Sequence, residues 1–131
     1  MGLIYLDSCL LIYLAEGHAQ WGAAVTQALA EVGDAHFGIS PLVKSECLVG
    51  PLKRNAPVLE QAYLELFERL VPLAVPDTVD IQAAQLRACT GIRPRDALHL
   101  ACAQQHRCDA LWTNDECLAQ VSHGLAVNIL H

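Results

Sequence analysis

Blocks of apolar residues along the chain predict short buried strands that alternate with helices. A continuous apolar run, typical of a buried parallel strand, occupies residues 3–6, and further segments that look like short strands occupy residues 36–39, 73–75, 109–112 and 125–130. Helical patterns occupy about residues 20–32, 41–49, 58–70 and 77–91, a segment from residue 94, and residues 116–121. This alternation predicts an α/β fold of three layers, α/β/α, with a central parallel sheet of four to five strands.

Capping residues set the expected ends of several helices. Ser40-Pro41 is a favourable helix start, with the serine as N-cap and the proline at the first helical position. Gly50-Pro51 should end that helix, and Asp77 or Thr78 should cap a later one. Because no linker or low-complexity stretch interrupts the pattern, we expect residues 1–131 to form one domain.

Four acidic residues stand in apolar surroundings where a carboxylate is costly. Asp7 and Asp115 each directly follow a predicted strand, whereas Glu46 and Asp96 lie on predicted helices. An isolated buried carboxylate is strongly destabilising unless positive charge compensates it. Ligands of parallel sheets gather beyond the carboxyl ends of the strands, so we expect these four residues, the acidic quartet, to meet at that edge.

Each acid has an ordinary explanation when it is taken alone. Asp7 could cap a helix, Asp96 could complement a helix dipole, and Asp115 could be a turn residue. Glu46 fits such explanations least, because it shares a helical stripe with apolar neighbours. Together, four like charges need neutralisation, and oxygen-only ligands select Mg²⁺, with Mn²⁺ as a substitute, rather than zinc.

Composition and charge narrow the class of protein. Eight basic and fourteen acidic residues give a formal net charge of −6, which argues against a nucleic-acid ligand, although neutralising the quartet would remove most of the excess. Several basic residues lie close to the acids in sequence and could form a local basic rim: Lys44, Lys53, Arg54, Arg93 and Arg95.

The six cysteines do not predict a zinc site. No CxxC motif occurs, and most of the cysteines lie in apolar segments, where they act as small hydrophobic residues. The longest apolar stretch, Cys9–Ala15, is far too short to cross a membrane, and the N-terminal residues do not resemble a signal peptide. We therefore expect a cytoplasmic protein with free thiols and no membrane partner.

The order and spacing of the acids, with their neighbours, resemble the PIN domain family. The chain carries D-S after the first strand, a lone glutamate on an apolar helix, R-D-A-L-H-L-A and T-N-D, in that order. More narrowly, it resembles the toxin ribonucleases of VapC-type toxin–antitoxin pairs over essentially its whole length. Ser8 and Thr113 match the family's hydroxyl positions. Where the family often has an aromatic residue, this chain has Glu116-Cys117-Leu118, and Leu118 could fill that packing role.

The resemblance implies an endoribonuclease that uses Mg²⁺ or Mn²⁺ to hydrolyse RNA phosphodiester bonds. Asp7, Glu46 and Asp96 would be direct or water-mediated metal ligands, and Asp115 would complete the metal site with support from Thr113. Ser8 is disfavoured as a nucleophile, because no histidine lies near it in sequence to act as a base. The expected partners are RNA, a cognate antitoxin and a second copy of the chain.

Two questions stay open at this point. A PIN-like domain that binds RNA or a partner without catalysis would share the same pattern, although an intact quartet argues against it. Arg93 and Arg95 could bind a substrate phosphate or an antitoxin carboxylate, or they could simply lie in an exposed loop. The role of Glu116 is not assigned, and His99 is expected to be packed or hydrogen-bonded rather than a ligand. A phosphorelay receiver is disfavoured, because no lysine follows Lys53.

Overall fold

The computed structural model describes residues 2–130, which form five strands and seven helices. The strands are β1 Leu3–Leu6, β2 His36–Ile39, β3 Val71–Pro72, β4 Ala110–Thr113 and β5 Ala126–Asn128. The helices are α1 Ser8–Ala15, α2 Gly22–Glu31, α3 Pro41–Lys53, α4 Pro57–Glu68, α5 Asp77–Thr90, α6 Pro94–Gln105 and α7 Glu116–Val121. None of the described helices is long and apolar enough to cross a membrane.

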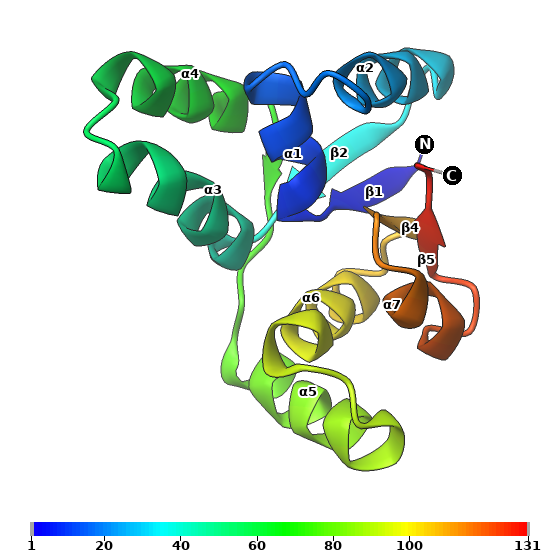
Figure 1. Ribbon diagram of the computed structural model, residues 1–131. Coiled ribbons are helices and arrows are strands. Elements are labelled where there is room, and N and C mark those ends of the chain that lie inside the picture. The colour runs from blue at the N-terminus through cyan, green and yellow to red at the C-terminus, as the bar shows by residue number, and fades with distance from the viewer. Residues whose placement is uncertain (1, 131) are drawn as a thin grey trace.

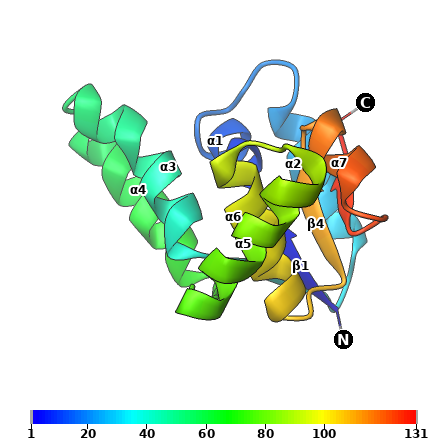
Figure 2. The same cartoon turned by 90° about the horizontal axis from the view of Figure 1, so that it is seen from below.

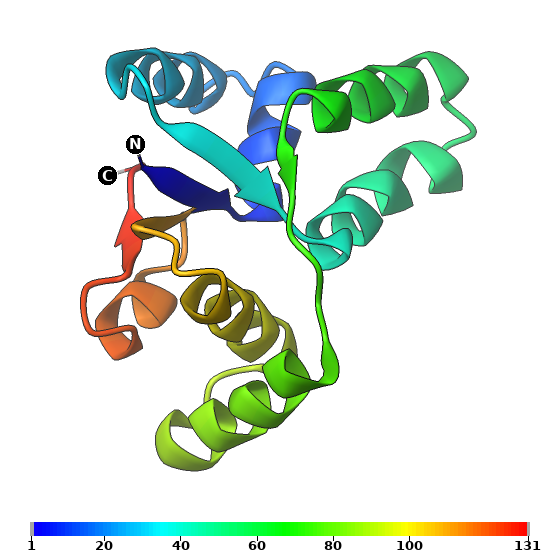
Figure 3. The ribbon, with the colours of Figure 1, turned by 180° about the vertical axis from the view of Figure 1, so that it is seen from behind.

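The five strands form one parallel sheet in the order β3-β2-β1-β4-β5. Helices α1 to α4 lie on one side of the sheet and helices α5 to α7 on the other (Figure 1), and the view from behind shows the same separation (Figure 3). The predicted three-layer α/β/α fold with a parallel central sheet is therefore confirmed.

The direction in which strands are added reverses at β1. Strands β2 and β3 are added on one side of β1, and β4 and β5 on the other. After β1 the chain continues into α1 on one face, and after β4 it continues into α7 on the opposite face (Figure 1). In parallel sheets ligands bind at such a switch point, so the edge beyond β1 and β4 is where a functional site is expected.

Helix α6 is the helix most deeply built into the core. It packs between the sheet and α5 (Figure 2), and seven of its twelve residues are buried. Its apolar residue Leu100 is fully buried, as are Tyr5 and Leu111 of the adjacent strands. Burial of each such side chain contributes roughly 1.5–3 kcal/mol. The same helix also carries Asp96 and His99 into the interior, where they meet the switch point.

Several predicted boundaries were wrong in instructive ways. Helix α3 continues past Gly50-Pro51 to Lys53, with Pro51 inside its last turn, where the missing N–H removes one hydrogen bond of the helix without ending it. Strand β3 is Val71–Pro72 rather than residues 73–75, and Pro72 is tolerated there because β3 is an edge strand. Helix α5 begins after Pro76, and neither Asp77 nor Thr78 caps it.

Candidate functional site

The four acids converge at the switch point, as predicted from their sequence context. Asp7 follows β1 and caps α1, accepting a hydrogen bond from the Ser8 backbone N–H at 2.7 Å. Asp115 follows β4 and caps α7, accepting from the Leu118 N–H at 3.1 Å. Glu46 reaches the same edge from α3, and Asp96 from the first turn of α6. The two aspartates that follow strands therefore cap helices and also belong to the quartet.

One guanidinium group joins three of the four carboxylates. The Nε atom of Arg95 lies 2.5 Å from Glu46 Oε2, and its Nη1 atom lies 3.0 Å from Asp96 Oδ1. Its Nη2 atom lies 3.0 Å from Asp7 Oδ1 and 3.3 Å from Ser8 Oγ. Oxygens from three separate elements thus meet around a single cation.

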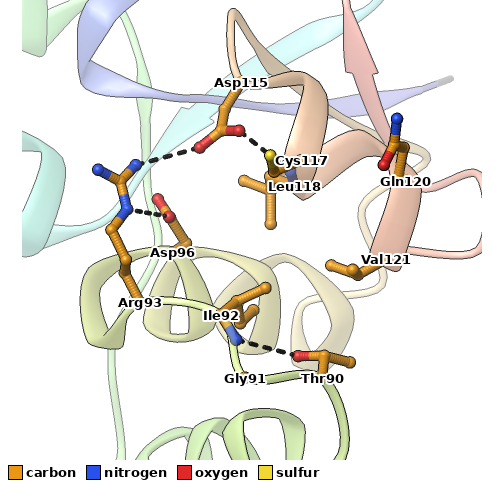
Figure 4. Close-up of a pocket in the computed structure, with 10 residues that line it drawn as sticks. All are labelled: Thr90, Gly91, Ile92, Arg93, Asp96, Asp115, Cys117, Leu118, Gln120 and Val121. Atoms are coloured by element: carbon orange, nitrogen blue, oxygen red, sulfur yellow. Dashed lines mark hydrogen bonds and ion pairs between the residues drawn. The ribbon is translucent and has the colours of Figure 1, made fainter.

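A second arginine, Arg93, joins Asp96 to the fourth carboxylate, Asp115. The Nε atom of Arg93 lies 2.8 Å from Asp96 Oδ2, and its Nη2 atom lies 3.1 Å from Asp115 Oδ2 (Figure 4). The Arg93 side chain is 66% exposed, so solvent weakens both ion pairs. Both arginines therefore contact the quartet. Arg93 does so from an exposed position just before α6, whereas Arg95 belongs to the helix itself.

Thr113 links the aspartates at the two strand ends. Its hydroxyl donates to Asp7 Oδ2 at 2.8 Å and accepts from the Asp115 backbone N–H at 3.1 Å. Thr113 and Asp7 are both buried, so this geometry is held by the core. The Ser8 hydroxyl, by contrast, is 3.4 Å from Asp7 Oδ1 and bonds to no histidine among residues 2–130, which again disfavours a serine nucleophile.

A buried chain of hydrogen bonds holds the carboxylate of Glu46 from behind. Glu46 Oε1 is 2.8 Å from His99 Nε2, and His99 Nδ1 is 2.6 Å from the Tyr5 hydroxyl. That hydroxyl is in turn 2.7 Å from Ser40 Oγ. Burial raises the pKa of Tyr5 well above its ordinary value, so its hydroxyl stays protonated and can donate to Nδ1. His99 Nε2 then donates to Glu46.

This buried chain explains two observations about the sequence. Ser40 precedes α3 at the N-cap position but makes no capping hydrogen bond, because its hydroxyl pairs with Tyr5 instead. His99 is fully buried and hydrogen-bonded at both ring nitrogens, as expected for a histidine that positions another residue. Sequence reasoning identified neither Tyr5 nor Ser40, since each looks like an ordinary strand or capping residue.

The charge state of Glu46 follows from these contacts. Burial opposes its ionisation, but the hydrogen bonds from His99 and Arg95 outweigh burial and lower its pKa from 4.5 to about 2. The same hydrogen bond with Glu46 raises the pKa of Arg95 above its ordinary value. Glu46 is therefore an anion at neutral pH, as a metal ligand must be.

The donor atoms fit a hard divalent cation. Asp7 Oδ1, Glu46 Oε2 and Asp96 Oδ1 already surround one positive group, and carboxylate oxygens are the ligands that Mg²⁺ and Mn²⁺ prefer. Asp7, Glu46 and His99 also offer atoms that lie within 4.8 Å of one another. Because His99 Nε2 is bonded to Glu46, we assign it an orienting role and regard the carboxylates as the ligands.

A cavity of about 610 Å³ lies beside the quartet, between the turn that joins α5 to α6 and helix α7 (Figure 4). Arg93, Asp96 and Asp115 form its polar end, and Ile92 and Val121 line its apolar part. A ligand in this cavity therefore reaches the outer carboxylates directly. The α5–α6 turn owes its shape to Gly91, which ends α5 with a left-handed φ of 73°.

Two residues after Asp115 have defined contacts. Glu116 accepts a hydrogen bond from the Asn128 side chain at 3.1 Å, which ties it to β5. Leu118 is 1% exposed and packs in the core, which confirms the packing role expected of it. All six cysteines are free, as predicted.

Comparison with known proteins identifies the family. The PIN domain family matches residues 4–124, and the chain therefore belongs to it. A comparison with curated protein sequences gave no match.

Solved structures share the fold. A toxin–antitoxin complex from Klebsiella pneumoniae is similar with a TM-score of 0.76 and 24% identity, over 98% of each chain. FitAcB from Neisseria gonorrhoeae has a TM-score of 0.72 and 24% identity, over 98% of this chain and 99% of that one. VapC20 from Mycobacterium tuberculosis, described as a Sarcin-Ricin loop cleaving toxin, has a TM-score of 0.75 and 14% identity, over 89% and 93% of the two chains.

Proposed function

We propose that this protein is an endoribonuclease that requires Mg²⁺ or Mn²⁺ and acts as the toxin of a toxin–antitoxin pair. The observation that carries the proposal is the convergence of Asp7 Oδ1, Glu46 Oε2 and Asp96 Oδ1 on one cation. Three carboxylates brought together at a switch point repel one another unless a cation lies between them, and a divalent metal would serve as such a cation. Membership of the PIN domain family and the toxins among its structural neighbours support the same activity.

In this mechanism the carboxylates of Asp7, Glu46, Asp96 and Asp115 would hold the metal. When bound, a divalent ion supplies Lewis acidity toward a water molecule and toward the phosphate oxygens. Thr113 fixes the orientation of Asp7, and His99 fixes that of Glu46, so the ligand oxygens are positioned before substrate arrives.

The substrate would lie along the outer side of the quartet. The cavity beside Asp96 and Asp115 would take a nucleoside next to the cleaved phosphate, because its apolar wall suits a base and its polar end adjoins the carboxylates. We further propose a cognate antitoxin and a second copy of the chain as partners, and a cytoplasmic location, which the free cysteines favour.

The test is cleavage of total cellular RNA by purified, antitoxin-free protein. We expect fragments with Mg²⁺ or Mn²⁺, none with excess EDTA, and none from Asp7→Asn. The exposed acid Asp34 lies outside the quartet, so Asp34→Asn is the matched control and should cleave normally. Intact RNA from the wild-type protein in both metals would reject the proposal, and so would unchanged cleavage by Asp7→Asn.

One observation favours a second candidate function. Arg93 and Arg95 together pair with all four carboxylates, as they would in a PIN domain that binds partners without catalysis. In that case the arginines would be permanent counter-ions. Thermal unfolding with and without millimolar Mn²⁺ separates the two, because a working metal site raises the melting temperature and a permanently neutralised one does not.

A further inference from the structure

The contacts of Arg95 divide the oxygens of three carboxylates into two sets. Asp7 Oδ2 is held by Thr113, and Glu46 Oε1 by His99, both through groups buried in the core. The other oxygen of each, Asp7 Oδ1 and Glu46 Oε2, faces Arg95, as does Asp96 Oδ1. Groups of the core thus fix one oxygen of Asp7 and one of Glu46, and the second oxygen of each points at the cation in the centre of the quartet. Asp7 Oδ1 also accepts the capping hydrogen bond from the Ser8 N–H.

The exposure and contacts of Arg95 allow its side chain to move out of that central position. Its side chain is 39% exposed, whereas those of Asp7 and Asp96 are 2% and 5% exposed. It extends from the first turn of α6 at the protein surface, and all of its observed side-chain hydrogen bonds go to the quartet or to Ser8. Because the Arg95 side chain is already partly in solvent, water can replace the carboxylates around its guanidinium once another cation neutralises them.

We propose that Arg95 and the divalent metal compete for the same three carboxylate oxygens, and that metal binding releases Arg95 to bind a phosphate of the RNA. This inference rests on the proposed function and adds a substrate-binding residue to it. A guanidinium and a metal ion cannot share oxygens that converge on one point. Once released, the guanidinium lies next to the site of reaction, and its planar donors suit a phosphate.

Arg93 adds a second cation where an RNA phosphate would enter. It borders the cavity beside the quartet, so a phosphate entering there meets one arginine already at the rim (Figure 4). A metal at the quartet would leave Arg95 without its carboxylate partners, and the phosphate would replace them. The chain therefore holds two cationic groups ready for an anionic substrate despite its net charge of −6.

The first arm of the test measures Mn²⁺ affinity by calorimetry for the wild type, Arg95→Gln and Arg95→Lys. Competition predicts about tenfold tighter binding by Arg95→Gln, because three ion pairs no longer oppose the metal. Arg95→Lys keeps the charge but cannot span three carboxylates, so its affinity should rise by a smaller factor. Arg54→Gln is the matched control, since Arg54 pairs with Glu16 at 3.1 Å, outside the quartet, and should leave affinity unchanged.

The second arm follows Arg95 in the wild-type protein. The side-chain Nε–H signal of Arg95, identified by its loss in Arg95→Gln, should shift on Mg²⁺ saturation to the position of an arginine free in solvent. The affinity for a labelled oligoribonucleotide is then measured with Ca²⁺ in place of Mg²⁺, and a gel checks that the RNA has kept its full length. We expect about fivefold weaker binding by Arg95→Gln, which is opposite in direction to its effect on Mn²⁺.

The outcomes separate this inference from the proposed function. Equal Mn²⁺ affinity in the wild type and Arg95→Gln would overturn the competition and leave the nuclease proposal standing. Tighter Mn²⁺ binding with unchanged RNA binding would overturn the phosphate role of Arg95. Failure of every variant to bind Mn²⁺ would overturn both the competition and the metal-dependent nuclease.

Discussion

The acidic quartet has an inner pair, Asp7 and Glu46, and an outer pair, Asp96 and Asp115, and the two are held by different physical means. The inner pair is bonded to Thr113 and to the buried His99, whose positions the core determines. The outer pair is bridged by Arg93, whose side chain is mostly exposed. Side chains of the core therefore preorganise the inner carboxylates. The outer ones are joined instead by an arginine that solvent reaches, and of the two Asp96 is itself buried.

The largest expected difference between the pairs is in catalysis. Asp7→Asn removes an oxygen anion that the core holds in place, and we expect RNA cleavage to fall at least about a thousandfold, as for the loss of several kcal/mol of metal-assisted stabilisation. Asp115→Asn should cost only about ten- to a hundredfold, because Asp115 completes the outer side. Initial cleavage rates at saturating Mg²⁺ measure both. Equal losses would show that the two pairs are not functionally distinct.

The next effect concerns the support behind Glu46. His99→Phe keeps the bulk of the ring but removes the partner of Glu46 Oε1 and one of the two partners of the Tyr5 hydroxyl. We expect a loss of about 1–3 kcal/mol in the free energy of unfolding and a ten- to hundredfold weaker affinity for Mn²⁺. Urea unfolding and calorimetry measure these quantities.

Tyr5→Phe is the matched control for that substitution. It removes the far end of the buried hydrogen-bonded chain and keeps the bond between His99 and Glu46. It should destabilise the fold by about 1–2 kcal/mol but change Mn²⁺ affinity much less than His99→Phe does. A metal affinity that falls equally in both variants would mean that general loosening, rather than the orientation of Glu46, is responsible.

A smaller effect should appear in the acid dependence of stability. Glu46 has a folded-state pKa of about 2 against an ordinary value of 4.5, because the hydrogen bonds from His99 and Arg95 outweigh its burial. Its contribution to stability is therefore fully present above pH 4.5 and is lost as the pH falls through about 2. Urea unfolding at several pH values in this window should show a shallower decline for Glu46→Gln than for the wild type. Parallel declines would contradict the assigned contacts.

The smallest effect is expected at the outer bridge. Arg93→Gln breaks two ion pairs that solvent already weakens, so thermal stability at physiological salt should match that of the wild type. Its Mn²⁺ affinity should rise less than that of Arg95→Gln, because Arg93 contacts only the outer carboxylates. A melting temperature clearly below that of the wild type would show that the outer pair is also part of the rigid framework.

The sequence by itself determined the architecture and the identity of the quartet. Short, mostly apolar segments predicted the parallel strands, and apolar residues at helical spacing predicted the layers that cover them, because burial imposes those periods on the chain. Asp7 and Asp115 could be placed at the sheet edge, since parallel strands end together. Element boundaries were less predictable where a proline lay in a final turn or an edge strand, as at Pro51 and Pro72.

Only the tertiary structure decided which groups hold the quartet. Arg95 is adjacent to Asp96 in sequence, yet its guanidinium also reaches Glu46 and Asp7, which are 49 and 88 positions away. His99 meets Tyr5 across 94 positions. The pattern of apolar and polar residues indicates whether a residue is buried, but it does not indicate which distant side chain that residue will contact. That depends on strand register, on helix packing and on rotamers, which are settled when the whole core assembles.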